Sequence, residues 1–261
     1  MSLLYVKDLC ITYRSGNKNY PAVVNVSFDI QEGEIVSLVG ESGSGKSSVA
    51  LAIGRLTDYL SCSVTGSLIF KDKPIFQLDP RELRDFRRRE IAYVFQEPAT
   101  SLNPVFKVGD QIREVLEKKD AKEAKELLRK VQLVDVERVY RAYPHELSGG
   151  MKQRAMIAMA LGKQPDLLIA DEPTTALDVT VQKEILRLLL QLKRQRALSI
   201  LLITHDLRVA SAISDRILIM QHGKLVEEIK DPKKLEVFYP YSVKLLSCAR
   251  MGGQPKSFFE V

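Results

Sequence analysis

The stretch Val39-Gly40-Glu41-Ser42-Gly43-Ser44-Gly45-Lys46-Ser47-Ser48 decides the fold of this chain. It matches G-x-x-x-x-G-K-[ST], the pattern of a phosphate-binding loop, with the fixed positions at Gly40, Gly45, Lys46 and Ser47. Residues 34–39 predict a short buried strand before the loop, and residues 47–56 predict a helix after it. Because a phosphate loop needs this order of strand, turn and helix, a chance glycine-rich turn is the weaker interpretation.

The loop pattern predicts binding of a nucleoside triphosphate. Glycines let backbone N–H groups point at phosphate oxygens, and the N-terminus of the following helix adds a partial positive charge. Lys46 is expected to reach the β- and γ-phosphates, and the Ser47 hydroxyl is expected to bind Mg²⁺. The candidate ATP-binding residues of the loop are Gly40, Glu41, Ser42, Gly43, Ser44, Gly45, Lys46, Ser47 and Ser48.

Length and composition fit one large α/β domain or a core with a small inserted subdomain. The chain has 261 residues, with 39 Lys and Arg against 33 Asp and Glu. This basic excess suits a nucleotide, a nucleic acid or an anionic membrane face, and it does not choose between them. Cys10, Cys62 and Cys248 are far apart, which favours reduced thiols over a disulfide framework or a metal site. We find no signal peptide and no apolar run near the ~18 residues of a membrane span, so another chain is expected to supply any span.

The first part of the chain predicts strands around the loop. Residues 3–13 and 21–30 have strand patterns, and their antiparallel pairing would leave Tyr13 near the loop. Tyr13 could stack on a nucleobase, or it could be a strand residue alone. Residues 80–90 predict a helix with several arginines interleaved with acids. A solvated face with ion pairs inside the helix is favoured there over a surface for an anionic partner.

The middle of the chain predicts a helical insertion between two strands. The strand 91–95 ends at Gln96, and a polar residue at the carboxyl end of such a strand points into the ligand crevice. The period of the sequence then becomes helical from residue 111 to about residue 134. Ser148 is a natural N-cap, and Gly149 and Gly150 leave N–H groups bare at the helix start. This is either a second anion site without a lysine or an ordinary capped helix.

Two further strands carry polar residues at their carboxyl ends. The strand 166–170 presents Asp171, which would hold Mg²⁺ through water, and Glu172, which would polarise an attacking water. Two solvated acids at a strand end would be the simpler interpretation of this pair. The functional interpretation is favoured because a phosphate loop needs carboxylates that bind Mg²⁺ and water. The strand 198–203 leads to His205, which could contact a γ-phosphate. Residues 215–229 predict a closing hairpin, and the tail that follows predicts one or two short helices.

Taken in order, these motifs resemble the nucleotide-binding subunit of ATP-binding cassette (ABC) transporters. The resemblance spans roughly residues 3–230 and rests on the phosphate loop, Gln96, Leu147-Ser148-Gly149-Gly150, Asp171-Glu172, Ala176-Leu177-Asp178 and His205. It implies an α/β fold with a RecA-like P-loop NTPase core, an N-terminal antiparallel β subdomain and an inserted all-helical subdomain. The implied parts of this single ABC ATPase domain are a core (1–96 and 164–230), a helical subdomain (97–163) and a C-terminal extension (231–261).

Within that family, three segments look like the oligopeptide/dipeptide/nickel importers, and most like the first of their two unlike ATPase subunits. They are Ser101-Leu102-Asn103-Pro104, residues 143–151 and residues 171–180. The implied partners are a related second ATPase subunit, two transmembrane permease subunits and an extracytoplasmic solute-binding protein, with no nucleic acid. The implied place is peripheral, at the cytoplasmic face of the cell membrane.

The resemblance also assigns roles to single residues. Tyr13 would stack on the base, Gln96 would join Mg²⁺ sensing to the membrane partner, and Asp178 would lie in the loop that crosses the dimer. Glu172 would be the catalytic base and His205 the γ-phosphate switch, while Ser47, Gln96 and Asp171 would surround Mg²⁺. A lid for the ATP of the partner subunit would consist of Leu147, Ser148, Gly149, Gly150 and Met151.

Other interpretations stay open at this point. An ABC ATPase of an exporter would share the motifs, as would a soluble DNA-repair or translation-associated ABC protein or an inactive regulatory cassette. Proteins of the soluble kind usually carry two cassettes or a long coiled-coil insertion, and intact Lys46, Glu172 and His205 argue against an inactive cassette. The sequence does not name the cargo, and peptide and nickel both remain candidates.

Overall fold

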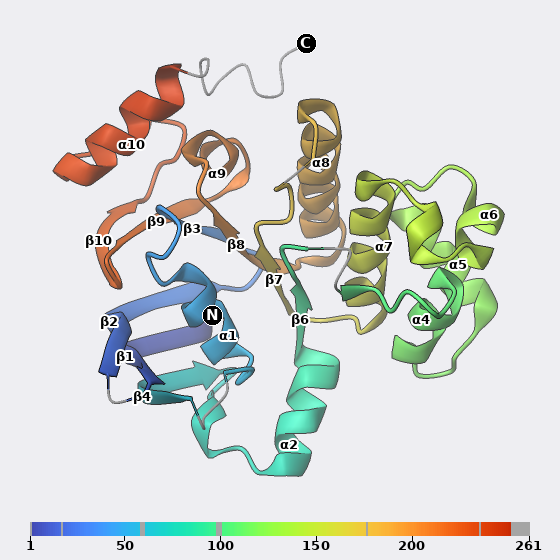
Figure 1. Ribbon diagram of the computed structural model, residues 1–261, viewed down its shortest axis with the longest axis horizontal. Helices are drawn as coiled ribbons and strands as arrows, with labels where there is room; N and C mark the ends of the chain where they lie inside the picture. The colour runs from blue at the N-terminus through green and yellow to red at the C-terminus, as the bar shows by residue number, and fades with distance from the viewer. Residues whose placement is uncertain are drawn as a thin grey trace.

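The computed structural model describes residues 2–16, 18–57, 61–97, 101–175, 177–234 and 236–251. Within these residues, two β-sheets lie beside a helical lobe, and a C-terminal helix covers the opposite end of the molecule (Figure 1). Ala176 of the Ala-Leu-Asp motif and the Cys248 side chain lie outside the described residues. Cys10 and Cys62 are free thiols, as the sequence predicts.

A mostly parallel sheet forms the centre of the molecule. Its strands are β3 (Ile35–Val39), β6 (Ile91–Val94), β7 (Leu167–Asp171), β8 (Ser199–Thr204), β9 (Arg216–Gln221) and β10 (Lys224–Ile229). In the described part of the chain, they follow the order β10-β9-β3-β8-β7-β6. Strand β3 pairs in parallel with both β8 and β9, whereas β10 closes the predicted hairpin antiparallel to β9. All five residues of β3 are buried, which is typical of a strand covered on both faces.

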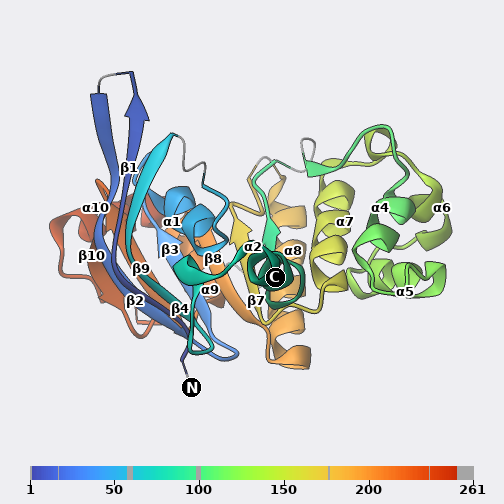
Figure 2. The ribbon, with the colours of Figure 1, turned by 90° about the horizontal axis from the view of Figure 1, so that it is seen from below.

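An antiparallel sheet packs on one side of this centre (Figure 2). Its strands are β1 (Ser2–Ser15), β2 (Lys18–Gln31), β4 (Cys62–Phe70) and β5 (Lys73–Pro74), and the described residues place them in the order β2-β1-β4-β5. The register between β1 and β2 sets Tyr13 opposite Tyr20. The predicted antiparallel opening of the chain is therefore present, and it forms a sheet of its own.

Alternating side chains of the central strands feed two different cores. On β7, Leu168 and Ala170 join a core with helix α8 (Val179–Arg196) and the helical lobe. Leu167 and Ile169 point the other way, into a core with the antiparallel sheet and helix α1 (Lys46–Ile53). Because successive side chains of a strand point to opposite faces, the apolar run of β7 serves both layers.

The helical lobe interrupts the sheet between β6 and β7. It contains α4 (Val108–Val115), α5 (Ala121–Lys130), α6 (Val136–Arg141), the 3₁₀ turn η3 (Pro144–Glu146) and α7 (Gly149–Gly162). The helical pattern predicted for 111–134 is two helices, since the backbone is extended at Leu116 and the Asp120 side chain caps α5. Figures 1 and 2 both show α4, α5 and α6 at the end of the molecule farthest from the C-terminal helix.

The arginine-rich helix spans the predicted residues 80–90, but three of its charged side chains contact other segments. Helix η1 (Ile75–Gln77) leads to α2 (Pro80–Asp85), which continues as a π-helical turn, η2 (Phe86–Glu90). Arg89 pairs with Glu117 of the helical lobe, and Glu90 pairs with Lys71. Arg87 donates to the Gly54 carbonyl. Arg89 and Glu90 of η2 therefore form ion pairs with other segments, instead of pairs within the helix.

The C-terminal part of the chain closes the sheet and covers its edge. Helix α9 (Leu207–Ile213) follows β8, and helix α10 (Pro240–Met251) packs back against α9. Buried side chains of both helices and of β9 form a third core with Val39, the last residue of β3. Among the described helices, none combines the length and the apolar character that crossing a membrane requires.

Candidate nucleotide-binding and hydrolysis site

The predicted site residues of four segments meet at one edge of the central sheet. The phosphate loop follows β3, Gln96 follows β6, Glu172 follows β7 and His205 follows β8. Parallel strands end at the same edge, so these segments surround a common crevice. This cavity of about 710 Å³ is lined by Ala22, Glu41, Ser42, Gly43, Gly45, Lys46, Ser47, Ser48, Gln96, Glu172 and His205.

The shape of the loop depends on two glycines that neighbouring backbone approaches closely. A Cβ atom on Gly40 would lie 2.2 Å from the Met220 carbonyl oxygen. A Cβ atom on Gly45 would lie 2.3 Å from the Ala22 carbonyl oxygen, and Gly45 also has a left-handed φ of 101°. Larger residues at either position would push the loop away from the strands that support it.

Lys46 is held inside the loop that it is predicted to serve. Its Nζ donates to the carbonyl oxygens of Gly40 (2.8 Å) and Glu41 (2.7 Å), and it lies 3.3 Å from Ser44 Oγ. Burial lowers the pKa of Lys46, while the carboxylates of Glu172 and Asp171 act in the opposite direction. The ammonium group is therefore fixed, with few water molecules around it, at the place where phosphate charge is expected.

Asp171 lies between a loop hydroxyl and a tyrosine. Ser47 Oγ donates to Asp171 Oδ1 (3.2 Å), and Tyr93 Oη donates to Asp171 Oδ2 (3.0 Å). Burial raises the pKa of Asp171, although both hydrogen bonds favour its charged form. The hydroxyl and the carboxylate oxygen are hard ligands, and they fit Mg²⁺ that keeps several waters and also binds substrate phosphates. Within the described residues, no three or more His, Cys, Asp or Glu side chains gather to hold a metal alone.

Three side chains converge on one oxygen of Glu172. Thr175 Oγ1 donates to Glu172 Oε2 (2.7 Å), Gln96 Nε2 donates to it (3.3 Å), and His205 Nδ1 lies 3.4 Å away. The backbone of Glu172 has a positive φ of 45°, and its N–H donates to the Ile203 carbonyl. The carboxylate is thus held in one orientation at the edge of the cavity, with its neighbours drawn from three strand ends.

Tyr13 lies beside the loop, where the strand pattern predicts it. Its hydroxyl donates to Ser48 Oγ (3.1 Å), and its side chain is half-buried at the end of β1 near the start of α1. Stacking on a nucleobase stays a prediction for this ring, and its position fits that role.

The predicted lid, residues 147–151, lies at the start of α7 in the helical lobe. Ser148 Oγ accepts a hydrogen bond from the Met151 N–H, which confirms the predicted N-cap, and Ser148 and Gly149 are exposed. A Cβ atom on Gly150 would lie 2.5 Å from Val181 Cγ1, so this glycine also permits close packing on α8. Lid residues are not among the described residues that line the loop's cavity.

Asp178 has a structural task in the folded chain. Its Oδ1 accepts a hydrogen bond from the Val181 N–H, which caps α8, and the residue is exposed. The dimer-loop role given to Asp178 by resemblance stays a prediction.

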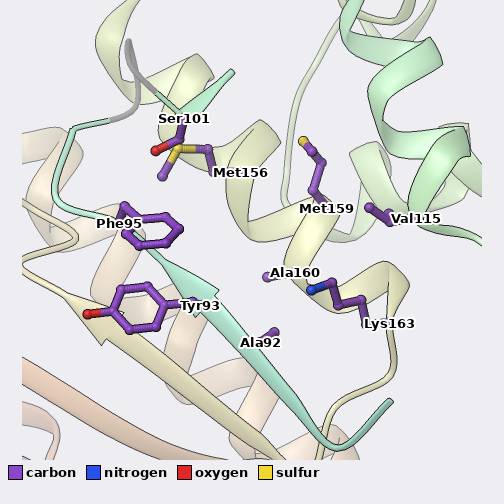
Figure 3. Close-up of a pocket in the computed structure, with 9 residues that line it drawn as sticks. All are labelled: Ala92, Tyr93, Phe95, Ser101, Val115, Met156, Met159, Ala160 and Lys163. Atoms are coloured by element: carbon purple, nitrogen blue, oxygen red, sulfur yellow. The ribbon is translucent and has the colours of Figure 1, made fainter. Parts of the chain in front are cut away.

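A second, mostly apolar groove lies between β6 and the helical lobe (Figure 3). It has a volume of about 450 Å³ and is lined by Ala92, Tyr93, Phe95, Ser101, Val115, Met156, Met159, Ala160 and Lys163. The rings of Tyr93 and Phe95 stack at 4.3 Å between centroids, just before Gln96. Tyr93 therefore has its ring in this groove and its hydroxyl on Asp171.

Thr175, Tyr93 and Tyr241 touch the site without having been singled out in the sequence. Thr175 holds Glu172 and Tyr93 holds Asp171, while the Tyr241 hydroxyl accepts a hydrogen bond from the Glu41 N–H of the phosphate loop (2.9 Å). Tyr93 is the one residue with a polar group in the otherwise apolar strand β6, and this pattern could have marked its hydroxyl as a candidate site group. Tyr241 has no local signal, since it lies 200 residues from its partner.

Comparison with known proteins supports the nucleotide site. The profile of the family described as "ABC transporter" matches residues 23–175. The chain is 46% identical over 269 residues to the peptidoglycan transport ATP-binding protein YejF of Agrobacterium fabrum, an alignment that covers 98% of this chain but only 48% of that protein. It is 41% identical over 273 residues to the dipeptide transport ATP-binding protein DppD of Haemophilus influenzae, covering 100% of this chain and 81% of that protein.

A solved structure is similar over most of its length. It is a dimeric ATP-binding cassette in a post-hydrolysis state, bound to ADP and Pi. It matches with a TM-score of 0.78 and 33% identity, covering 90% of this chain and 100% of that one. The α/β P-loop NTPase class predicted from the sequence is thereby confirmed.

Proposed function

The chain belongs to the ABC transporter family of ATPases, and we propose that it powers a membrane importer for peptides as one of two ATPase subunits. The observation that carries the proposal is the fixed carboxylate of Glu172. Thr175, Gln96 and His205 all meet its Oε2 atom, beside a loop with the lysine and serine that bind triphosphate.

In the proposed reaction, Glu172 is the general base. The carboxylate lies at the edge of the phosphate cavity, where it would accept a proton from the attacking water. Lys46 and the backbone N–H groups of the loop would stabilise charge on the transferred phosphoryl group, because such reactions depend mostly on positioning and electrostatics. His205, whose Nδ1 lies 3.4 Å from Glu172 Oε2, would contact the γ-phosphate and report whether it is present.

Mg²⁺ is the proposed metal cofactor. Ser47 Oγ and Asp171 supply hard oxygen atoms at the mouth of the loop, and Gln96 lines the same cavity. A bound Mg²⁺ would neutralise phosphate charge in the reaction. The chain's part is to keep Asp171 ionised and oriented, which the hydrogen bonds from Ser47 and Tyr93 favour.

The proposed active unit is a head-to-tail pair of ATPase subunits. Ser148 and Gly149 are exposed at the start of α7, where the first N–H groups have no partner within the helix. Residues 147–151 are not among the described residues that line the cavity of their own chain's loop. We propose that they cover the ATP of a second, related ABC subunit, whose own lid covers Lys46. The similar dimeric cassette bound to ADP and Pi supports a paired arrangement.

The apolar groove beside Gln96 is the proposed contact for the permease. Its occupant would be a short helix from a cytoplasmic loop of one of two transmembrane subunits, with an apolar face for Tyr93, Phe95 and the methionines of α7. Lys163, whose pKa is lowered by burial, sits at one end of the groove and could bind a carboxylate or the C-terminus of that helix. Tyr93 lines the groove and Gln96 lies next to it. A helix bound in the groove could therefore shift Glu172 through its contact with Gln96, and Asp171 through its contact with Tyr93.

Peptide is the proposed class of cargo. The two relatives compared above are named as a dipeptide transport ATP-binding protein and a peptidoglycan transport ATP-binding protein. Neither name refers to nickel. The chain would then work peripherally at the cytoplasmic face of the membrane, with an extracytoplasmic solute-binding protein as the further partner. Uptake of labelled dipeptides, and not of Ni²⁺ or of drugs moving outward, would separate this proposal from nickel import and from export.

The proposal is tested by replacing Glu172 with Gln in the assembled ATPase. We expect ATP to bind as in the wild type while turnover falls by about 10²-fold or more, because the general base is lost. Steady-state phosphate release and equilibrium ATP binding are the measurements. Glu32→Gln removes a charge from an exposed turn and is the matched control. Near-normal turnover in Glu172→Gln would contradict the assignment of the base.

A further inference from the structure

The C-terminal helix α10 reaches back to the phosphate loop through one hydroxyl group. Tyr241 is the second residue of α10, and only 8% of its surface is exposed. Its Oη accepts a hydrogen bond from the Glu41 N–H at 2.9 Å. This contact joins the beginning of the nucleotide-binding core to a helix that lies outside the matched family region, which ends at residue 175.

The same peptide group is held from both sides. The Glu41 N–H belongs to the peptide between Gly40 and Glu41, and the carbonyl oxygen of that peptide accepts a hydrogen bond from Lys46 Nζ at 2.8 Å. Lys46 Nζ also donates a hydrogen bond to the carbonyl oxygen of Glu41, at 2.7 Å. The carbonyl oxygen of the 40–41 peptide thus accepts from the Lys46 ammonium, while its N–H group donates to Tyr241.

Packing keeps the Tyr241 hydroxyl at this place. Tyr241 and Leu246 of α10 share a core with Val39, the residue directly before the loop, and with Ile217 and Ile219 of β9. Burial raises the pKa of Tyr241, so its hydroxyl stays protonated and neutral at physiological pH. A neutral oxygen on a docked helix is a fixed acceptor for a backbone N–H group.

We propose that Tyr241 is a positioning residue for ATP binding, which makes α10 a working part of the phosphate loop. When Lys46 turns toward the phosphates, it must weaken its bonds to the Gly40 and Glu41 carbonyls, and these hold the start of the loop. Tyr241 keeps the 40–41 peptide in place through that exchange. The loop then meets the phosphates already ordered, so less conformational entropy is lost on binding.

The inference rests on the proposed binding of ATP by the loop, and the test separates the two. Tyr241→Phe keeps the ring and the packing of α10 but removes the acceptor. The matched control is Tyr239→Phe, which removes the same atom from a half-exposed ring two positions away. Both are made in the full chain, and ATP and ADP affinities are measured together with steady-state turnover and thermal unfolding.

In Tyr241→Phe we expect ATP and ADP to bind about three- to tenfold more weakly, as one lost hydrogen bond implies. KM for ATP should rise in proportion while kcat stays within about twofold, since the hydroxyl does not touch the reacting atoms. Amide hydrogen exchange at Glu41 should become faster in the nucleotide-free protein. Tyr239→Phe should match the wild type in all of these measurements.

The result that overturns the inference is wild-type affinity in Tyr241→Phe, or a lower thermal midpoint with unchanged affinity. Either would mean that the hydroxyl serves only the packing of α10. If the wild type itself failed to bind ATP, the proposed function would be contradicted and this inference with it. ATP binding by the wild type, with equal affinity in Tyr241→Phe, would overturn this inference alone.

Discussion

The two segments proposed to bind phosphate, the phosphate loop at 40–48 and the lid at 147–151, are built in opposite ways. The loop is enclosed: Gly40 and Gly45 press against neighbouring backbone, Lys46 is buried, and its Nζ is bonded to the loop itself. The lid is open, with Ser148 and Gly149 exposed at the start of α7. It has a cap and bare N–H groups, but no lysine.

The difference shows which half of the site a single chain can complete. The cavity beside the loop already contains Lys46 together with the carboxylates of Glu41 and Glu172. The lid offers the same kind of N–H groups to solvent, on the lobe beyond the central sheet (Figure 1). We therefore expect one subunit to bind ATP with its loop and to need another subunit's lid for rapid hydrolysis.

Breaking the loop should give the largest effect. Lys46→Ala removes the buried ammonium, and ATP affinity of the isolated chain should fall by about 10- to 100-fold, the range for a lost charge-assisted hydrogen bond. Hydrolysis in the pair should fall with it. The control is Lys224→Ala, an exposed lysine of β10. Unchanged ATP affinity in Lys46→Ala would show that the enclosed loop is not the binding half.

The next largest effect should come from removing the charge of Asp171, beside the proposed Mg²⁺ site. In Asp171→Asn, the Mg²⁺ concentration that gives half-maximal hydrolysis should rise by about 10- to 100-fold, as expected when a ligand that acts through water is lost. Because the same carboxylate would bind either a proton or the ion, the wild type should also need more Mg²⁺ as the pH falls through the raised pKa of Asp171.

The same variant should unfold at a higher temperature when no nucleotide is present. Burial raises the pKa of Asp171 in the folded state, so its ionised form costs stability at every pH above its ordinary range. The neutral amide would keep one oxygen to accept from Ser47 or Tyr93, and its NH2 group could donate to the other hydroxyl, without that cost. Thermal unfolding at neutral pH checks this, with Asp72→Asn as an exposed control. A lower midpoint would mean that the charge of Asp171 stabilises the nucleotide-free fold.

The sequence predicted those parts of the site that depend on local pattern. The phosphate loop, the polar residue after each buried strand and the N-cap at Ser148 are all marked by neighbouring residues, and the structure places them as expected. Strand order is different, because no local signal says that β3 lies between β8 and β9. The resemblance to a known family supplied a RecA-like core in advance, without the order of its strands.

Side chains that hold the site from a distance could not be found in this way. Tyr93 meets Asp171 across 78 residues and Tyr241 meets Glu41 across 200 residues, so only the folded chain brings them together. Two ion pairs of the arginine-rich helix were missed for the same reason. Helical spacing predicts partners within the helix, whereas Arg89 pairs with Glu117 and Glu90 pairs with Lys71.

Vanadate trapping of a photoreactive ATP analogue in the assembled pair tests the shared site most directly, because gel separation shows which subunit's loop holds the label. With Ser148→Arg in this chain, we predict that trapping is lost on the partner ATPase, whose loop needs this lid, and persists on this chain. ATP should still bind the isolated Ser148→Arg subunit with wild-type affinity. Loss of label from this chain, with the partner's label intact, would contradict the account, since the lid would then serve its own loop.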